Sequence, residues 1–470
     1  MSTSTGPRST STDDRGYPRF WDEERETMGR AQRDTVILER IQHQLRYVYS
    51  ELPFYRRHYD AHGFHPDQVR TLEDFTTKVP VITKKMLVAD QKENPVFGSY
   101  TNITEPGKIA RIHGSSGTSG VPTVYAVSKG DWERAGQVHA MAQWCAGIRP
   151  DDLVQVGFPF GLFFGGWGVV QGVEVIGATL FPLGVTDSEK HIEFIQRLGS
   201  TAFSATPSYC IHLLGVAERM GVDLAASTVR NLLVGGEPGG SLPGTRTAIE
   251  QGWGATVVDA GSTSEMYPFQ TSVGCEDGTG THLFTDEVFS EIVDKDDPNV
   301  PVVDGQRGAV IYTHLWRESQ PMIRFAPGDE SYMTHETCSC GRTYPRLPEG
   351  VLGRLDDMLV VRGANIFPSA VETGLRSVAG FGPEFQIRVR RVGALDELTV
   401  SAEYDDDTRT AMKNSDADGA ESLQRRLVAE AEASLKRLTG IRIPVELLPP
   451  GTLPETTFKA RRVVDERPRN

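Results

Sequence analysis

The residues whose types and spacing best suit ligand binding lie at 111–123, which read RIHGSSGTSGVPT. Glycine allows positive φ and brings backbone N–H groups close to an anion, while Ser and Thr add short donors for phosphate oxygens. The stretch lies between two apolar runs, 108–112 and 121–127, where a flexible Gly/Ser linker is rare. We therefore interpret it as a phosphate-binding loop, distinct from the GxxxxGK[ST] type. The residues predicted to bind phosphate are Ser115, Ser116, Gly117, Thr118, Ser119 and Gly120.

A second group with metal-ligating chemistry comprises Cys275, His282, Cys338 and Cys340. The Cys-x-Cys-Gly motif at 338–341 places two thiolates on one turn, and Cys275 and His282 flank a Gly-rich turn that can form a hairpin. Three thiolates and one imidazole make a closed tetrahedral Zn²⁺ site. Spacing alone supports a metal site and unrelated thiols equally. Such a site would have no open ligand position, so we interpret it as structural.

The elements that must position these groups alternate between strands and helices. Apolar residues at helical spacing predict a helix over 33–52, and 72–85 predicts a short helix and a turn. After the loop, strand-like runs end in Gly-rich turns, with helices predicted near 188–198 and 208–220. The predicted strands are 153–156, 178–181, 202–205, 232–234 and 256–259. This order predicts an α/β fold whose ligand sites gather at the carboxyl ends of the strands.

From about residue 283 the pattern changes to β-rich hairpins, and residues 353–357 resemble a junction. Beyond it we predict a small α+β unit with strands at 358–361, 385–391, 397–403 and 443–447 and a helix at 420–438. The predicted organisation is a disordered tail (1–15), a large N-terminal α/β domain with a β-rich subdomain (16–352), a hinge (353–357) and a small mobile C-terminal domain (358–470).

Composition excludes several classes of function. The chain has 470 residues and a net charge of −14, with 49 basic and 63 acidic residues, which argues against nucleic-acid binding. No apolar run approaches the ~20 residues that span a bilayer, and the Ser/Thr-rich N-terminus is unlike a signal peptide. Five cysteines in such a chain favour thiols or metal ligands over disulfides, so we expect a cytoplasmic protein.

Together these motifs resemble the phenylacetate-CoA ligase family of the adenylate-forming (acyl-CoA synthetase, adenylation and luciferase) superfamily, over residues 20–467. The phosphate loop is similar to the family's HxSSGTTGxPT, and residues 323–329 (IRFAPGD) to its RxxGD segment. The most specific matches are GRLDDMLVVRGANIFPS at 353–369 and FKARRVVD at 458–465.

The resemblance implies a two-step reaction in which a carboxylate attacks the α-phosphate of ATP, and the acyl-adenylate then passes to coenzyme A. It implies that Thr118 holds the triphosphate, Glu265 helps to place Mg²⁺, and Asp329 binds the ribose hydroxyls. Arg354 would reach the ribose or phosphate, and Lys459 would contact the carboxylate and α-phosphate during adenylation. Asp356 would be the hinge. The other implied nucleotide contacts are Gly236, Glu237, Pro238, Asp259, Ala260 and Gly261.

The glycine- and phenylalanine-rich run 157–168 is similar to the family's aryl-pocket segment. Its glycines open space that a packed core would not need, which favours a pocket for an aryl or arylacetic acid. The residues implied to contact this small aromatic acid are Phe158, Phe163, Phe164, Ser208, Tyr209 and Gly235.

Three positions depart from the family pattern, at Val121, Gly261 and Ala326. The first removes a loop cation and the second an aromatic residue that commonly stacks on adenine. They keep open an alternative, a biosynthetic aryl-adenylating enzyme whose acceptor is a carrier protein or an amine, or which diazotises an amino-aryl acid. A third reading is a zinc-containing ligand-binding protein on a degenerate ligase scaffold. By analogy the chain is expected to form a homodimer.

Overall fold

The structure is a computed structural model that describes residues 12–103, 105–115, 123–162, 164–276, 278, 280–355, 358–361, 364–392, 395–456 and 462–467. Within these ranges, none of the helices is long and apolar enough to cross a membrane.

Helices dominate the N-terminal part of the chain. They are α1 (Glu23–Glu26), α2 (Arg30–Glu51), α3 (Pro53–Ala61), α4 (Leu72–Lys78) and α5 (Lys84–Glu93), with a 3₁₀ turn at Pro66–Gln68. Helix α2 confirms the predicted helix, because Ile37, Ile41 and Leu45 recur at helical spacing and are buried. The predicted short helix and turn at 72–85 left out a strand and the start of a second helix. Pro80 disfavours helical backbone at Val79, and Ile82–Thr83 forms strand β1 before α5 begins.

An eight-stranded sheet forms the centre of the large domain, in the order β15-β10-β9-β8-β7-β6-β4-β5. Strands β4 (Leu153–Val156), β5 (Thr179–Phe181), β6 (Ala202–Ala205), β7 (Asn231–Gly235) and β8 (Thr256–Gly261) are parallel to one another. Strands β9 (Ser272–Gly274), β10 (Thr281–Leu283) and β15 (Arg346–Leu347) extend the sheet in antiparallel fashion. The five predicted strands are therefore confirmed, and their carboxyl ends share one edge.

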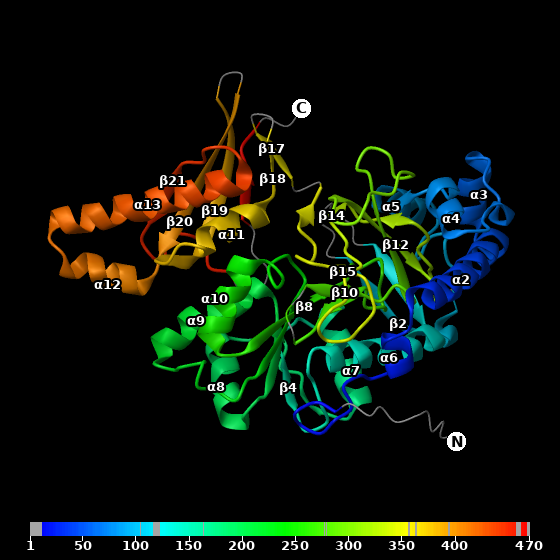
Figure 1. The fold of residues 1–470 in the computed structure, drawn as a ribbon, viewed down its shortest axis with the longest axis horizontal. Coiled ribbons are helices and arrows are strands. Elements are labelled where there is room, and N and C mark those ends of the chain that lie inside the picture. The colour runs from blue at the N-terminus through cyan, green and yellow to red at the C-terminus, as the bar shows by residue number, and fades with distance from the viewer. Residues whose placement is uncertain are drawn as a thin grey trace.

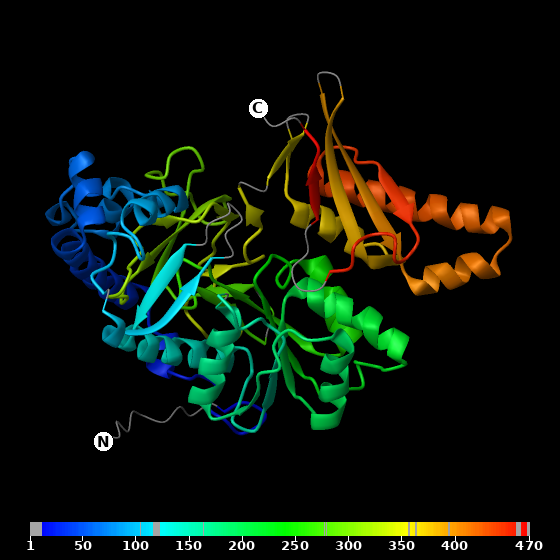
Figure 2. The ribbon, with the colours of Figure 1, turned by 180° about the vertical axis from the view of Figure 1, so that it is seen from behind.

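Helices connect the strands of this sheet (Figures 1 and 2). The connecting helices are α7 (Gly165–Ile176), α8 (Ser188–Leu198), α9 (Pro207–Met220) and α10 (Pro243–Trp253), and α6 (Lys129–Cys145) precedes β4. Helix α9 begins where Thr206 accepts a hydrogen bond from the backbone N–H of Tyr209, with Pro207 in its first turn. Strands β4, β5, β6 and β7 thus each lead from the carboxyl edge into a helix, the arrangement that places ligands at this edge.

A second sheet carries the β-rich part of the large domain. Its order is β1-β13-β12-β14-β16, with β11 (Val288–Val293) paired to β12 (Gly308–His314). The shorter strands are β13 (Phe325–Ala326), β14 (Asp329–Ser331) and β16 (Gly353–Arg354). Strands β2 (Ile109–Gly114) and β3 (Val124–Ser128) form a separate antiparallel pair after a 3₁₀ turn at Pro106–Lys108.

The C-terminal part forms a smaller unit beside α9 and α10, drawn in yellow, orange and red in Figure 1. A four-stranded sheet has the order β21 (Val445–Leu448), β20 (Leu395–Tyr404), β19 (Phe381–Val392) and β22 (Val463–Asp465). Strands β17 (Leu359–Val361) and β18 (Ala364–Ile366) form a hairpin, and the helices are α11 (Pro368–Arg376), α12 (Asp406–Asn414) and α13 (Ala417–Thr439). The predicted α+β unit is confirmed, although α11, α12, β18 and β22 were not predicted.

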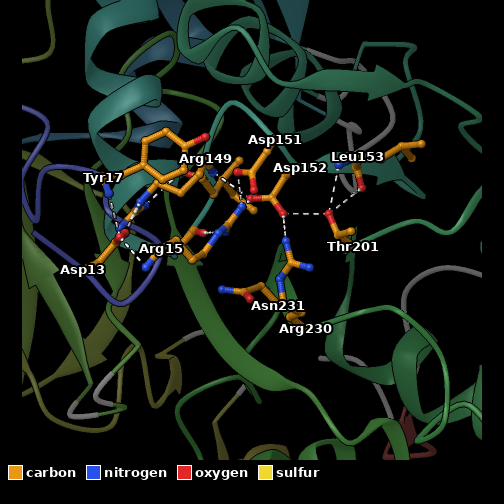
Figure 3. A network of polar contacts seen from close by, with 12 residues as sticks. Asp13, Arg15, Tyr17, Arg149, Asp151, Asp152, Leu153, Thr201, Arg230 and Asn231 are labelled. Atoms are coloured by element: carbon orange, nitrogen blue, oxygen red, sulfur yellow. Dashed lines mark hydrogen bonds and ion pairs between the residues drawn. The ribbon is translucent and has the colours of Figure 1, made fainter.

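At the amino edge of the central sheet, Asp152 organises a network that holds the N-terminal segment (Figure 3). Its carboxylate accepts from Arg15, 3.0 Å away, from Thr201, 2.7 Å away, and from Arg230. Arg149 pairs with Asp13 at 2.7 Å. The predicted tail, residues 1–15, was therefore too long, because Asp13 and Arg15 are fixed by ion pairs. Residues 1–11 lie outside the described ranges.

Candidate active site

The stem of the predicted phosphate loop is closed by Ser115 and Thr123. The backbone N–H of Ser115 donates to the carbonyl of Thr123 at 2.9 Å, and the two side-chain oxygens lie 2.9 Å apart. Gly114, the last residue of β2, is paired with Val124, the first residue of β3, so residues 116–122 connect two paired strands. The segments on either side of residues 116–122 are therefore paired with each other, unlike the two ends of a linker between domains. The loop residues Ser116, Gly117, Thr118, Ser119 and Gly120 lie outside the described residues.

Glu265 lies beside this stem although it is far away in the sequence. The Tyr125 hydroxyl lies 3.0 Å from Thr123 Oγ1 and 3.3 Å from Glu265 Oε1, so it links the carboxylate to the stem. The Glu265 residue is only 4% exposed. A buried carboxylate next to a phosphate loop is suitably placed for a divalent cation.

Lys84 is a residue of this group that the sequence did not predict. Its Nζ lies 3.0 Å from Glu265 Oε1, and its side chain is 36% exposed. The amine therefore lies next to both the candidate cation ligand and, through Tyr125, the loop stem. No local signal marks Lys84, because its neighbour Lys85 has the same residue type. Only the fold brings positions 84 and 265 together.

The carboxyl ends of β7 and β8 carry the next predicted contacts. Gly235 is paired with Ala260, and a Cβ at Gly235 would lie 2.5 Å from the Ala260 carbonyl oxygen, so only glycine fits there. Asp259 accepts a hydrogen bond from the Ser241 hydroxyl at 2.7 Å, and burial raises its pKa to about 6. Gly236 and Pro238 follow β7, and Gly261 is the last residue of β8.

Glu237 holds the first turn of α9, which was not predicted. Its Oε1 accepts the backbone N–H of Ser208 at 2.9 Å. A carboxylate at a helix N-terminus satisfies a free N–H and interacts favourably with the helix dipole. Glu237 therefore joins the turn after β7 to the predicted acid-binding residues Ser208 and Tyr209.

Asp329 and Arg354 lie opposite each other in the antiparallel pair of β14 and β16. Asp329 is 7% exposed, and Arg354 Nη2 donates to the carbonyl of Pro327 at 3.2 Å. The predicted ribose-binding carboxylate and its neighbouring arginine are thus brought together by strand register. Asp356, the predicted hinge residue, lies outside the described residues.

The predicted acid-binding residues come from three strand ends. Phe158 follows β4 and is 4% exposed, and Ser208 and Tyr209 begin α9. Phe164 is the N-cap of α7, and its ring contacts that of Tyr267, with centroids 3.6 Å apart. The contact of Phe164 with Tyr267 therefore places two aromatic rings together near the carboxyl ends of the strands. Phe163 lies outside the described residues.

The four predicted metal ligands converge. The ligand atoms of Cys275, His282, Cys338 and Cys340 all lie within 4.8 Å of one another, and all four residues are buried. None of the five cysteines forms a disulfide. The sulfur atoms of Cys275 and Cys338 are 3.8 Å apart, and Cys340 Sγ lies 3.3 Å from His282 Nε2. Two sulfurs at about 2.3 Å from a tetrahedral Zn²⁺ lie about 3.8 Å apart, so this group could hold a metal ion.

A cavity of about 580 Å³ opens elsewhere, at the amino ends of β7 and β8. Its lining includes Arg230, Arg246, Glu250 and Glu276. This cavity is on the opposite edge from the predicted ligand contacts and does not belong to the candidate active site.

Comparison with known proteins decides the family. A "phenylacetate-coenzyme A ligase" of Thermus thermophilus is 34% identical over 450 residues, which are 94% of this chain and 99% of that protein. One of the same name from Escherichia coli is 32% identical and covers 91% and 94% of the two chains. The AMP-binding enzyme C-terminal domain family matches residues 363–467. The chain belongs to the phenylacetate-CoA ligase family. The predicted membership in the adenylate-forming superfamily is thereby confirmed.

Solved structures of a 2-hydroxyisobutyryl-CoA ligase match nearly the whole chain. Its postadenylation state, in complex with R3-HIB-AMP, is 37% identical, covers 98% of this chain and 94% of that one, and gives a TM-score of 0.90. Its thioesterification state, with 2-HIB-AMP and CoA, is 39% identical, covers 96% and 93%, and gives 0.71. The two scores differ although identity and coverage are almost equal. The present arrangement of this phenylacetate-CoA ligase family member is thus closer to the postadenylation state.

Proposed function

We propose that the chain activates an aryl or arylacetic acid with ATP and transfers the acyl group to coenzyme A. It is an AMP-forming acid–CoA ligase of the phenylacetate-CoA ligase type. In the first step a carboxylate oxygen bonds to the α-phosphorus and pyrophosphate leaves. In the second step the CoA sulfur bonds to the acyl carbon, the bond to AMP breaks, and the thiol proton is lost to solvent.

The observation that carries this proposal is the cluster of Glu265, Lys84 and the loop stem, in a chain that matches these ligases along nearly its whole length. Glu265 would bind Mg²⁺, which when bound offsets the negative charge of the phosphates. Asp329 and Arg354 would hold the ribose, and Lys459 would meet the reacting carboxylate. Fixed charges that surround the phosphates lower the barrier because they need no reorganisation during the reaction.

The test is pyrophosphate release from ATP and Mg²⁺ with a panel of acids, each with and without CoA. We expect release that depends on phenylacetate or a related aryl acid, and a CoA thioester when CoA is present. Release without a thioester would favour the biosynthetic adenylating enzyme with another acceptor. Bound ATP without release from any acid would contradict ligase activity and favour the ligand-binding alternative.

A small aliphatic hydroxy acid is a second candidate substrate. A 2-hydroxyisobutyryl-CoA ligase is similar to this chain over nearly its full length, and the hydroxyls of Ser208 and Tyr209 lie at the predicted acid site. Hydroxyl donors distinguish acids by hydrogen bonding, whereas aromatic walls favour a flat ring. The panel therefore includes 2-hydroxyisobutyrate, and the ratio of kcat/KM for the two acids decides between them.

Lys84 would supply the cation that the loop lacks at Val121. We expect Lys84→Met to lower the rate of adenylate formation about tenfold to a hundredfold, because one fixed positive charge near the phosphates is lost. The adjacent, exposed Lys85→Met is the matched control and should leave the rate unchanged. The measurement is acid-dependent exchange of pyrophosphate into ATP. Equal rates for both variants would show that Lys84 only pairs with Glu265.

The buried group of three cysteines and one histidine would bind Zn²⁺ in a structural role. Its donor set and the spacing of its sulfurs suit a closed tetrahedral site, and all four residues are buried. The site connects the β9–β10 hairpin to the turn at 338–341, away from the reacting atoms.

A further inference from the structure

Helix α9 touches both the predicted acid site and the small domain. Its first turn carries Ser208 and Tyr209, and its side packs against β19 of the small domain. Figures 1 and 2 both show α9 directly beside the small domain. Contacts on this helix are therefore able to link the acid site with the orientation of the small domain.

The small domain presents Glu455 to α9 from a fixed backbone. The backbone N–H of Leu453 donates to Glu403 at 2.6 Å. Thr456 donates to Glu384 from its backbone N–H at 2.9 Å and from its hydroxyl at 2.8 Å. Both accepting carboxylates are buried, at 4% and 5% exposure. Although the Glu455 side chain is 60% exposed, hydrogen bonds hold the backbone before and after it.

Two residues of α9 meet this carboxylate. His212 Nδ1 lies 3.4 Å from Glu455 Oε1, and Arg219 Nη2 lies 3.5 Å from the same oxygen. The His212 side chain is only 6% exposed, so the contact is half buried on the side of the large domain. We name these three residues the domain latch.

The other ring nitrogen of His212 leads toward the acid site. Nε2 lies 3.0 Å from the Ser188 hydroxyl, which lies 3.2 Å from the Tyr209 hydroxyl. The rings of Tyr209 and His212 also stack, with centroids 5.6 Å apart. Burial lowers the pKa of His212, which favours a neutral ring. A neutral ring that accepts at Nε2 from Ser188 directs its Nδ1–H toward Glu455.

We propose that the domain latch stabilises the domain arrangement in which the acyl-adenylate forms, and that it opens for the CoA step. The inference rests on the proposed function. The domain arrangement here is closer to the postadenylation structure than to the thioesterification structure of the similar ligase. Rotation of the small domain would carry Glu455 away from α9, whereas Ser188, Tyr209 and His212 would stay together in the large domain. His212 and Glu455 are therefore positioning residues.

The experiment measures the two half-reactions separately for Glu455→Gln, His212→Asn and the double variant. The first is acid-dependent pyrophosphate exchange into ATP, and the second is thioester formation from supplied acyl-adenylate and CoA. We expect each single variant to slow only the first, by about two- to fivefold, the range for a partly exposed contact to a carboxylate. The double variant should be no slower than Glu455→Gln, because that variant already removes the carboxylate that His212 contacts. Glu421→Gln, in an exposed pair with Arg425 on α13, is the matched control.

Three results would overturn the latch. They are equal slowing of both half-reactions, multiplicative effects in the double variant, and variants that match wild type in both steps. Wild-type protein that forms neither adenylate nor thioester would instead overturn the proposed function. Since Glu455 is exposed, its variant should keep the wild-type melting temperature, which separates a positioning effect from a loss of folding.

Discussion

Lys459→Ala is expected to abolish adenylate formation almost completely, by roughly 10²- to 10³-fold in rate, the range for removal of one group that stabilises transition-state charge. The resemblance of residues 458–465 to the family motif assigns this lysine to the reacting carboxylate and α-phosphate. Lysine suits that role because its ammonium is a point charge on a flexible stem. The measurement is acid-dependent pyrophosphate exchange with the best acid of the panel.

The same variant should still convert supplied acyl-adenylate and CoA to thioester at close to the wild-type rate, since the proposed role of the lysine is confined to the first step. Lys413→Ala, an exposed lysine on α12, controls for the loss of a positive charge from the small domain. Loss of both half-reactions would show that Lys459 is required for thioester formation as well as for adenylate formation. Normal exchange would remove it from the catalytic residues. Lys459 itself lies outside the described residues, but Thr456 and Arg462 on either side of its segment both donate to Glu384.

Much of the fold could be predicted from local pattern. The five short apolar runs that were predicted as strands became β4 to β8, because a parallel sheet needs short apolar strands and short connections. Helix α12 was not predicted since it is acidic and polar, and Thr408 is its only buried residue. Strand β22 was not predicted because Val463–Asp465 pairs in parallel with β19, which is about 70 residues earlier in the chain.

The candidate site was predictable where chemistry is marked by residue type and spacing. The metal group converged as expected because its cysteines sit on a turn and beside a hairpin, which are local features. Lys84 and the bond from Ser208 to Glu237 were not predictable, because each depends on which distant side chains the fold places together. Their residue types occur many times on any surface, so composition carries no signal for them.

Cys340→Ser is expected to remove the bound metal and to destabilise the large domain strongly, on the order of 4 kcal/mol, since loss of a structural metal belongs to the most destabilising changes. The segment after the Cys-x-Cys turn is bonded to helix α1. Arg342 pairs with Glu26 at 2.6 Å, and Thr343 N–H donates to the Glu26 carbonyl at 3.0 Å. Without the metal, the buried thiols of Cys275 and Cys338 and the imidazole of His282 would lose their common partner, and this connection should loosen with them. The measurements are metal content per chain and the thermal unfolding midpoint.

Cys210→Ser is the matched control, because it makes the same change at a buried thiol in α9, outside the metal group. It should keep one metal per chain and unfold close to wild type. Chelation of the wild-type protein should reproduce the Cys340→Ser midpoint, since both remove the same ion. Folded chelated protein should keep measurable adenylate formation at low temperature, because the four ligands leave no position for substrate. Immediate loss of activity without unfolding would contradict the structural role, and wild-type protein purified without metal would contradict the site itself.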